Sequence, residues 1–177
     1  MFRRFAILAA MLVFLLFFSG SSSFTVEGYK PVYAPASEAK QIKALELRDV
    51  ETQGKIYIKD HYIFIGDLNK GVHVIDNTDP RNPQKILFIQ IYGNHDIAIK
   101  GSVMYADNME DLVAIDISDI YNPLEIKRIE DVYELPNQSY PEDVAWGTYF
   151  QCVDPDLGYV VGWVPGLIMD PECMTTY

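Results

Sequence analysis

The sequence predicts an all-β protein: two tandem, four-stranded antiparallel repeats of propeller-blade size, followed by a disulfide-tied C-terminal cap. Two segments share one pattern, forty residues apart and without a gap. They are GKIYIKDHYIFIGDLNKGVHVIDNTDPRNPQKILF from Gly54 and NHDIAIKGSVMYADNMEDLVAIDISDIYNPLEIKR from Asn94. A fixed period of this length indicates repeated supersecondary units. The dense β-branched residues and the frequent Gly and Pro exclude a helical repeat.

Residues 1–23 are expected to form a signal peptide. Arg3 and Arg4 precede an apolar run over residues 5–18, and small residues follow at 19–23, which is the pattern of a secretory leader. The alternative is a retained anchor, but the run is shorter than the ~20 residues that a membrane span needs. Residues 18–21 resemble a bacterial lipobox in which Ser21 stands in place of the lipidated cysteine. Because serine cannot form the thioether, cleavage near residues 21–23 without lipidation is the expectation.

The charge of the chain limits its partners. The formal net charge is −11, and removal of a leader with two arginines and no acid would change it to −13. Nucleic acids and anionic lipid surfaces attract fields of Lys and Arg, so an acidic chain argues against both. Contact with a membrane is therefore expected only through the leader, if it is retained or lipidated.

Residues 24–53 are expected to form an extended arm with one short helix. Ser37 has the residue type of an N-cap, Glu38 would lie in the first turn, and Ala39, Ile42 and Leu45 would give a short apolar stripe.

Each repeat divides into four short apolar segments. The first repeat, residues 54–93, has expected strands at 55–59, 62–66, 71–75 and 85–91. The second repeat, residues 94–132, has them at 96–99, 103–106, 112–115 and 124–129. Strands that are apolar on both sides must be covered on both faces, and two blades cannot close a ring. The flanks must supply further strands, the two sheets must pack face to face, or several chains must associate.

Residues 133–177 are expected to form a cap, because strand-like pieces at 148–150 and 158–164 lack the turn of the repeats. The tail contains the two cysteines of the chain, Cys152 and Cys173. In an exported chain, such a pair indicates a disulfide. Neither cysteine has the CxxC spacing of redox sites or a neighbouring histidine.

The acidic turns of the repeats are the candidate metal site. Asp76 and Asp79 occur in the first turn, and Asp116 and Asp119 occur in the second. Clustered carboxylate and amide oxygens are the ligands that Ca²⁺ takes. The structural alternative is that each Asp accepts backbone N–H groups two residues further on, before a proline ends the turn.

No residue pattern indicates catalysis. Asp67 and Asp107 occupy corresponding repeat positions, which favours strand-end turn formers over a catalytic pair. His61, His73 and His95 share no ligand spacing, and His73 corresponds to Val113, so it is expected on a sheet face. The sequence has no GxSxG, HExxH, phosphate-loop or dinucleotide motif. The expectation is therefore a protein that is not an enzyme and has no cofactor.

The strand-and-turn segments resemble a known repeat. Residues 72–76 and 112–116 are apolar strands that end in Asp before a turn ending in Pro, and this is similar to the LVIVD repeat. The Tyr-Lys-Pro-Val-Tyr opening and the Gly-Tyr-Val-Val-Gly-Trp ending also resemble uncharacterised exported proteins of Bacteroidetes-type bacteria. The second repeat departs from the pattern at Ile120, where the first has Pro80. The resemblance implies a propeller-like repeat and a location in the cell envelope, and it implies no catalytic residue.

These observations lead to one expectation and one alternative. The chain is expected to be exported to the periplasm, outer membrane or cell surface. There it would serve as a non-enzymatic interaction module for a protein or glycan partner, with homo-oligomers as a way to cover open sheet edges. The alternative is a small-molecule or Ca²⁺-dependent binding protein that uses the turns at Asp76, Asp79, Asp116 and Asp119.

Overall fold

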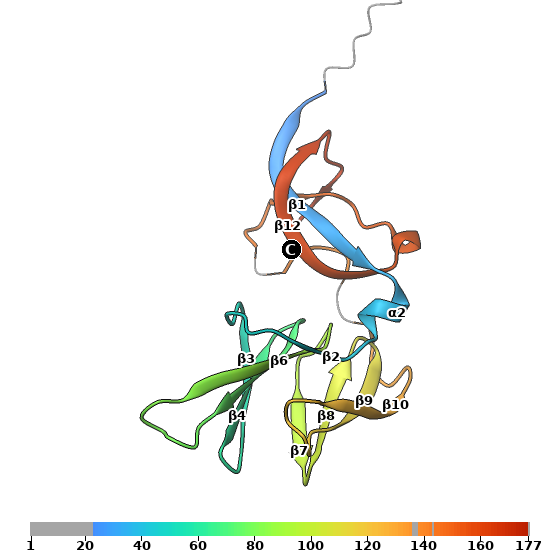
Figure 1. The fold of residues 1–177 in the computed structure, drawn as a ribbon. Coiled ribbons are helices and arrows are strands. Elements are labelled where there is room, and N and C mark those ends of the chain that lie inside the picture. Colours follow the sequence, from blue (N-terminus) through green and yellow to red (C-terminus); the bar gives the residue numbers. More distant parts are fainter. Residues whose placement is uncertain (1–22, 136–137, 143, 177) are drawn as a thin grey trace, which may run out of the picture.

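The computed structural model describes residues 23–135, 138–142 and 144–176. It is an all-β structure of three sheets, which confirms the predicted fold class at that level. Two sheets, one from each repeat, lie side by side, and the third lies across one end of both (Figure 1). The expected leader falls outside the described residues. Within the described ranges, no helix is long and apolar enough to cross a membrane.

The strands of both repeats form where the sequence predicts them. The first-repeat sheet contains β3 (Gln53–Lys59), β4 (Tyr62–Asp67), β5 (Gly71–Asp76) and β6 (Gln84–Gln90). The second-repeat sheet contains β7 (Ile97–Lys100), β8 (Val103–Asn108), β9 (Asp111–Asp116) and β10 (Leu124–Ile129). Each sheet is antiparallel, with its repeat strands in chain order. The first-repeat sheet also takes β2 (Lys43–Leu45) from the arm, which pairs with the edge of β6.

The gap-free offset of forty residues is wrong at the start of each repeat. Lys59 pairs with Tyr62 across the first hairpin, and Lys100 pairs with Val103 across its counterpart, so these positions are 41 residues apart. The difference arises because Asp67 and Gly71 enclose a three-residue loop in the first repeat. In the second repeat, two residues separate Asn108 from Asp111. Sequence could not place this gap, because strands that are apolar on both sides carry no alternation to fix their register.

The two repeat sheets pack face to face around one shared core. The core takes Phe64, Val72, Val74 and Ile89 from the first repeat, and Met104, Val113 and Ile115 from the second. Ile120 also lies in this core and is 6% exposed, whereas its counterpart Pro80 is exposed. The second repeat therefore places an apolar residue in the core where the first repeat has an exposed proline.

The third sheet joins the two ends of the chain, and we call it the cap sheet. β1 (Thr25–Ala34) pairs antiparallel with β12 (Tyr159–Met169) from one end to the other, and parallel with β11 (Tyr149–Phe150). β13 (Cys173–Met174) completes the sheet beside β11. The predicted disulfide is present between Cys152 and Cys173, with Cα atoms 5.3 Å apart. The arm thus completes the cap, and only its β2 segment joins a repeat.

The short helix is shorter than the apolar stripe predicts, and its N-cap is not Ser37. α2 spans Ala36–Ala39, and Pro35 is its N-cap, with its carbonyl accepting the N–H groups of Glu38 and Ala39. The helix ends early because the backbone of β2 is used in pairing with β6. α2 lies at the junction of the cap sheet and the repeats (Figure 1). There Ala39 packs with Ala34 and Met109.

Candidate functional site

A cavity of about 170 Å³ lies between the cap and one end of the two repeats. Its repeat side is formed by the loop between β4 and β5, with Leu68, Asn69 and Lys70, and by Met109 of the loop between β8 and β9. Its cap side is formed by β12 and by the segment containing Gln138, Tyr140 and Glu142. The cavity therefore joins segments that are far apart in the sequence.

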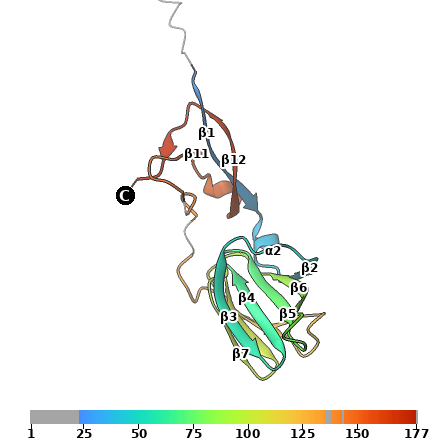
Figure 2. The same ribbon diagram turned by 90° about the vertical axis from the view of Figure 1, so that its left-hand side faces the viewer.

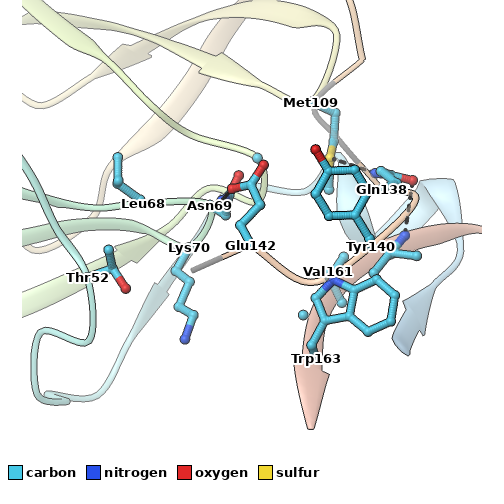
Figure 3. Close-up of a pocket in the computed structure, with 13 residues that line it drawn as sticks. Thr52, Leu68, Asn69, Lys70, Met109, Gln138, Tyr140, Glu142, Val161 and Trp163 are labelled. Atoms are coloured by element: carbon cyan, nitrogen blue, oxygen red, sulfur yellow. Dashed lines mark hydrogen bonds between the residues drawn. The ribbon is translucent and has the colours of Figure 1, made fainter. Parts of the chain in front are cut away.

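Aromatic side chains form one wall of the cavity. Figure 3 shows the side chains of Tyr140 and Trp163 on one side, and those of Thr52 and Lys70 on the opposite side. The ring of Trp163 packs edge-to-face on Phe150 of β11, with centroids 5.7 Å apart. This contact fixes the indole in place, so Trp163 can offer a preformed apolar surface to a ligand.

Polar groups lie beside the aromatic wall. Gln138 is held at both ends, because its Oε1 accepts the Val160 N–H at 3.1 Å and its Nε2 lies 3.6 Å from the Met109 sulfur. Asn69 donates from Nδ2 to Glu142 Oε2 at 3.4 Å, across the boundary between repeat and cap. A few fixed polar groups in a partly apolar cavity are typical of small-ligand sites.

Lys70 is the positively charged residue among those that line the cavity. Burial lowers the pKa of its ammonium group, and the positive charge of Arg48 lowers it further, while Asp67 acts in the opposite direction. The Lys70 ammonium also forms an ion pair with Glu51, which in turn pairs with Arg48. These partners hold the lysine side chain at one edge of the cavity.

An ionic network fixes the cap on the repeats. Lys40 lies between Glu110 Oε1, at 2.6 Å, and Asp111 Oδ2, at 3.1 Å. Arg128 contacts Asp111 at 2.8 Å, and the Tyr159 hydroxyl donates to Glu110 at 2.7 Å. Burial alone would lower the pKa of Lys40, but the hydrogen bonds and charges of the two carboxylates outweigh it and raise that pKa. The network links the arm, the second repeat and the cap.

Three carboxylates of this region could hold a metal by distance alone. One oxygen each of Glu110, Asp111 and Asp131 lies within 4.8 Å of the others. However, Lys40 and Arg128 already supply positive charge to Glu110 and Asp111. We therefore assign the cluster a structural role.

The four predicted calcium ligands lie in exposed turns at the ends of the sheets away from the cap. Asp76 accepts the Thr78 N–H at 2.8 Å, and Asp116 accepts the Ser118 N–H at 2.8 Å. Asp79 and Asp119 likewise accept backbone N–H groups two residues further on. This is the geometry of the structural alternative. In Asp119 the second carboxylate oxygen is used as well, because it accepts from Asn122 Nδ2 at 2.7 Å. Calcium binding at these turns stays an untested alternative.

Asp67 and Asp107 both hold the loop that precedes the first strand of their repeat. Asp67 accepts the Thr52 N–H at 2.8 Å, and Asp107 accepts those of His95 and Asp96, each at 2.9 Å. They are not equivalent in the sheets, because Asp67 is five residues after Tyr62 whereas Asp107 is four after Val103. Each nevertheless stabilises a loop backbone.

The histidines lie apart from the cavity lining. His73 lies on a sheet face, as predicted, where it is buried against Phe88 with Nε2 3.2 Å from Asp67 Oδ2. The hydrogen bond to Asp107 raises the pKa of His95, and burial opposes this effect. Sequence reasoning missed the cavity altogether. The one sequence signal for the cavity was the strand that contains Trp163, and from sequence this strand indicated only a part of the cap.

The sheets and the cavity define the chain as an all-β repeat protein with a small cavity beneath its cap. Residues 53–87 and 93–131 match the LVIVD repeat, so one segment in each repeat of the chain is similar to it. No curated protein and no solved structure matches the chain.

Proposed function

We propose that this protein is a non-enzymatic interaction module of the cell envelope, and that the cavity beneath the cap binds a glycan. The observation that carries the proposal is the pairing of the Trp163 ring with fixed polar groups on a single site. Sugars present an apolar face that stacks on aromatic rings and hydroxyl groups that need hydrogen-bonding partners. Gln138, Asn69 and Glu142 would supply those partners.

Export is part of the proposal, and the disulfide supports it. Disulfides such as Cys152–Cys173 persist in oxidising compartments and are rare in the cytosol. The basic and apolar residues at the start of the sequence agree with export. After expression of the full chain in a bacterial host, mass spectrometry of the extracytoplasmic protein should find an N-terminus near residues 21–23. A cytoplasmic protein that retains residues 1–20 would contradict this part.

An oligosaccharide microarray of bacterial envelope glycans tests the proposed ligand. The folded protein should bind a subset of the glycans, and Trp163→Ala should lower that binding up to ~10-fold, because stacking on an aromatic face contributes about 0.5 to 1.5 kcal/mol. Trp146→Ala is the matched control, since Trp146 is exposed in the cap and is not among the cavity residues.

Two readouts separate loss of the site from loss of the fold. Circular dichroism melts should show that Trp163→Ala still unfolds cooperatively, although its contact with Phe150 is lost. Gln138→Ala should weaken glycan binding without removing that aromatic contact. The proposal is wrong if no glycan binds the wild type, or if Trp163→Ala and Gln138→Ala both bind as the wild type does.

A further inference from the structure

The two repeats pack through opposite faces of the same sheet design. β5 and β9 correspond at an offset of forty, because Asp76 and Asp116 end them in equivalent pairs. The first repeat buries Val72 and Val74, whereas the second buries Val113 and Ile115. Val72 and Val74 correspond to Leu112 and Ala114, which lie on the opposite face of β9.

The same inversion holds for the first strands of both repeats. With the observed offset of 41, Tyr57 of β3 corresponds to Ala98 of β7, and Ile56 and Ile58 correspond to Ile97 and Ile99. Tyr57 packs against the shared core in the first repeat, while Ile97 and Ile99 are buried there in the second. The contact between the repeats is thus head-to-tail, because two different faces of the repeat meet in it. Each repeat therefore keeps one face out of this contact, and that unused face corresponds to the face that the other repeat buries.

On β3 and β4 the unused face of the first repeat is apolar and exposed, whereas on β5 and β6 the same face carries His73 and Phe88, which are buried. Ile56 is 49% exposed and Ile58 is 67% exposed, and both lie beside Ile63 and Ile65 of β4, with which they pair across the hairpin. Figure 2 looks onto this sheet, with the second-repeat sheet behind it. This face corresponds residue by residue to the one that the second repeat buries.

The unused face of the second repeat is hollowed and only partly apolar. It carries Ala98, Tyr105 and Leu112, which line a hollow of about 260 Å³ together with Tyr133 and the acidic residues Asp96 and Asp107. Tyr105 corresponds to the buried Phe64, and it is 39% exposed. Ala98 stands where the first repeat has Tyr57, so a side chain that fills space within the chain is missing on this face.

We propose that a second copy of this chain docks head-to-tail, with its first-repeat face on the second-repeat face of its neighbour. The contact would repeat the one inside each chain, so that the order of repeats continues from copy to copy. Within the chain, Ile99 lies opposite Tyr57, whose hydroxyl donates to the Ile99 carbonyl at 2.9 Å. In the docked pair, Ile58 takes the place of Ile99 and enters the hollow beside Ala98.

A second copy fits these faces better than an unrelated partner, because both halves of the contact are already present on one chain. Each bare face is the counterpart of a buried face, and the buried pair shows how two such faces pack against each other. Large exposed apolar faces on sheets mark interaction sites. A head-to-tail contact of this kind gives a closed ring or a filament, depending on the rotation between neighbours.

Light scattering with blocked faces tests this inference. Ile58→Arg blocks the first-repeat face, and Ala98→Arg blocks the second-repeat face. Both residues are exposed, so both variants should fold as the wild type does by circular dichroism. The wild type should have the mass of a dimer or larger assembly, and each variant alone should be smaller than the wild-type assembly, because it retains a single competent face.

Mixing the two variants distinguishes the head-to-tail contact from a symmetric one. Each retains the face that the other needs, so the mixture should form a 1:1 heterodimer and no larger species. Leu167→Lys on β12 of the cap sheet is the matched control, because it changes an exposed apolar residue away from both faces and should leave the wild-type mass unchanged. A monomeric wild type overturns the inference and assigns the faces to another occupant. An assembly that survives both substitutions, or a mixture that stays monomeric, overturns it as well.

Discussion

At the scale of single residues, Gly71 shows how little room the sheet leaves for a side chain. Its φ is +142°, and a Cβ there would lie 2.0 Å from the carbonyl oxygen of Ile89 on the neighbouring β6. The ladder between β5 and β6 therefore needs glycine at this position, since a larger residue must push the strands apart.

Gly71→Ala should lower the free energy of unfolding by ~3 kcal/mol or more, through both the clash and the backbone conformation. Gly101→Ala is the matched control. Gly101 also has a positive φ, +62°, but a Cβ added there would have no other atom within 4 Å, so only the ~1 kcal/mol conformational cost is expected. Urea denaturation of both variants measures the difference. Equal decreases in the free energy of unfolding would show that the close approach to β6 does not contribute to the effect of Gly71→Ala.

His95 makes stability depend on pH in a definite direction. Its pKa is raised in the folded protein, first by the hydrogen bond to Asp107. The stabilisation is therefore fully present below the ordinary histidine value of about 6.5, and it is lost as pH rises through the higher folded-state pKa. His95→Gln should flatten this part of the stability profile. Melting temperatures measured across that window check the prediction, and a wild-type profile as flat as that of the variant would contradict it.

At the scale of elements, the disulfide closes the weakest part of the cap sheet. β11 and β13 share two residue pairs, Tyr149–Met174 and Phe150–Cys173, and Cys152–Cys173 lies beside them. A ladder this short gives little stability by itself. The covalent link therefore supports the strand on which Trp163 packs through Phe150.

Replacing both cysteines by serine should lower the free energy of unfolding by about 3 kcal/mol, as expected for a closed loop of this size. Hydrogen exchange should increase in residues 149–153 and 159–169. Residues 62–67 and 71–76 should keep their protection, because the shared core of the repeats does not depend on the cap disulfide. Uniform loss of protection in both regions would contradict this separation.

The acidic turns are elements with the same design in both repeats. Each Asp at a strand end already accepts a backbone N–H, and the hydrogen bonds from Thr78 hold the pKa of Asp76 below its ordinary value. We expect the melting temperature to be the same in Ca²⁺ and in chelator. A ligand that binds only the folded state must raise that temperature, so an increase in Ca²⁺ that Asp79→Asn and Asp119→Asn abolish would favour the calcium alternative.

At the scale of the whole molecule, the ionic network around Lys40 connects the arm, the second repeat and the cap. Burial opposes the charged state of Asp111, but hydrogen bonds from Arg128 and Lys40 outweigh it and lower the pKa of that carboxyl. The pKa of Glu110 is lowered in the same way, against the effect of burial, by Lys40 and Tyr159. The stabilisation is present above the ordinary carboxyl values of about 4, and it is lost as pH falls through the folded-state values.

Lys40→Met should move the midpoint of acid unfolding to a higher pH and lower the neutral-pH stability by about 1 to 3 kcal/mol, because Glu110 and Asp111 each lose a charged partner. Lys100→Met, on an exposed position of β7, is the control and should leave both values unchanged. If both variants unfold at the same pH, the network does not hold the cap on the repeats.

Local patterns in the chain were enough to predict the strands of the two repeats and the disulfide. The apolar runs and the turns with Gly, Pro and Asp marked where each repeat strand begins and ends, and the cysteine pair had a single available pairing. These signals are carried by residues close together in the chain, or by a chemistry with one possible partner.

Three features required the packed structure: the buried face of each sheet, the strand that completes the cap, and the position of the cavity. β3 and β7 both alternate, with isoleucines on one side and lysines beside Tyr57 or Ala98 on the other. This pattern predicts the isoleucine side inward in both strands, so sequence could not show that Tyr57 faces inward while its counterpart Ala98 faces outward. The pairing of β1 with β12 and the meeting of Asn69 with Glu142 join residues far apart in the chain. Such contacts depend on how the sheets pack, and a one-residue difference in a loop is enough to exchange the two faces of a strand.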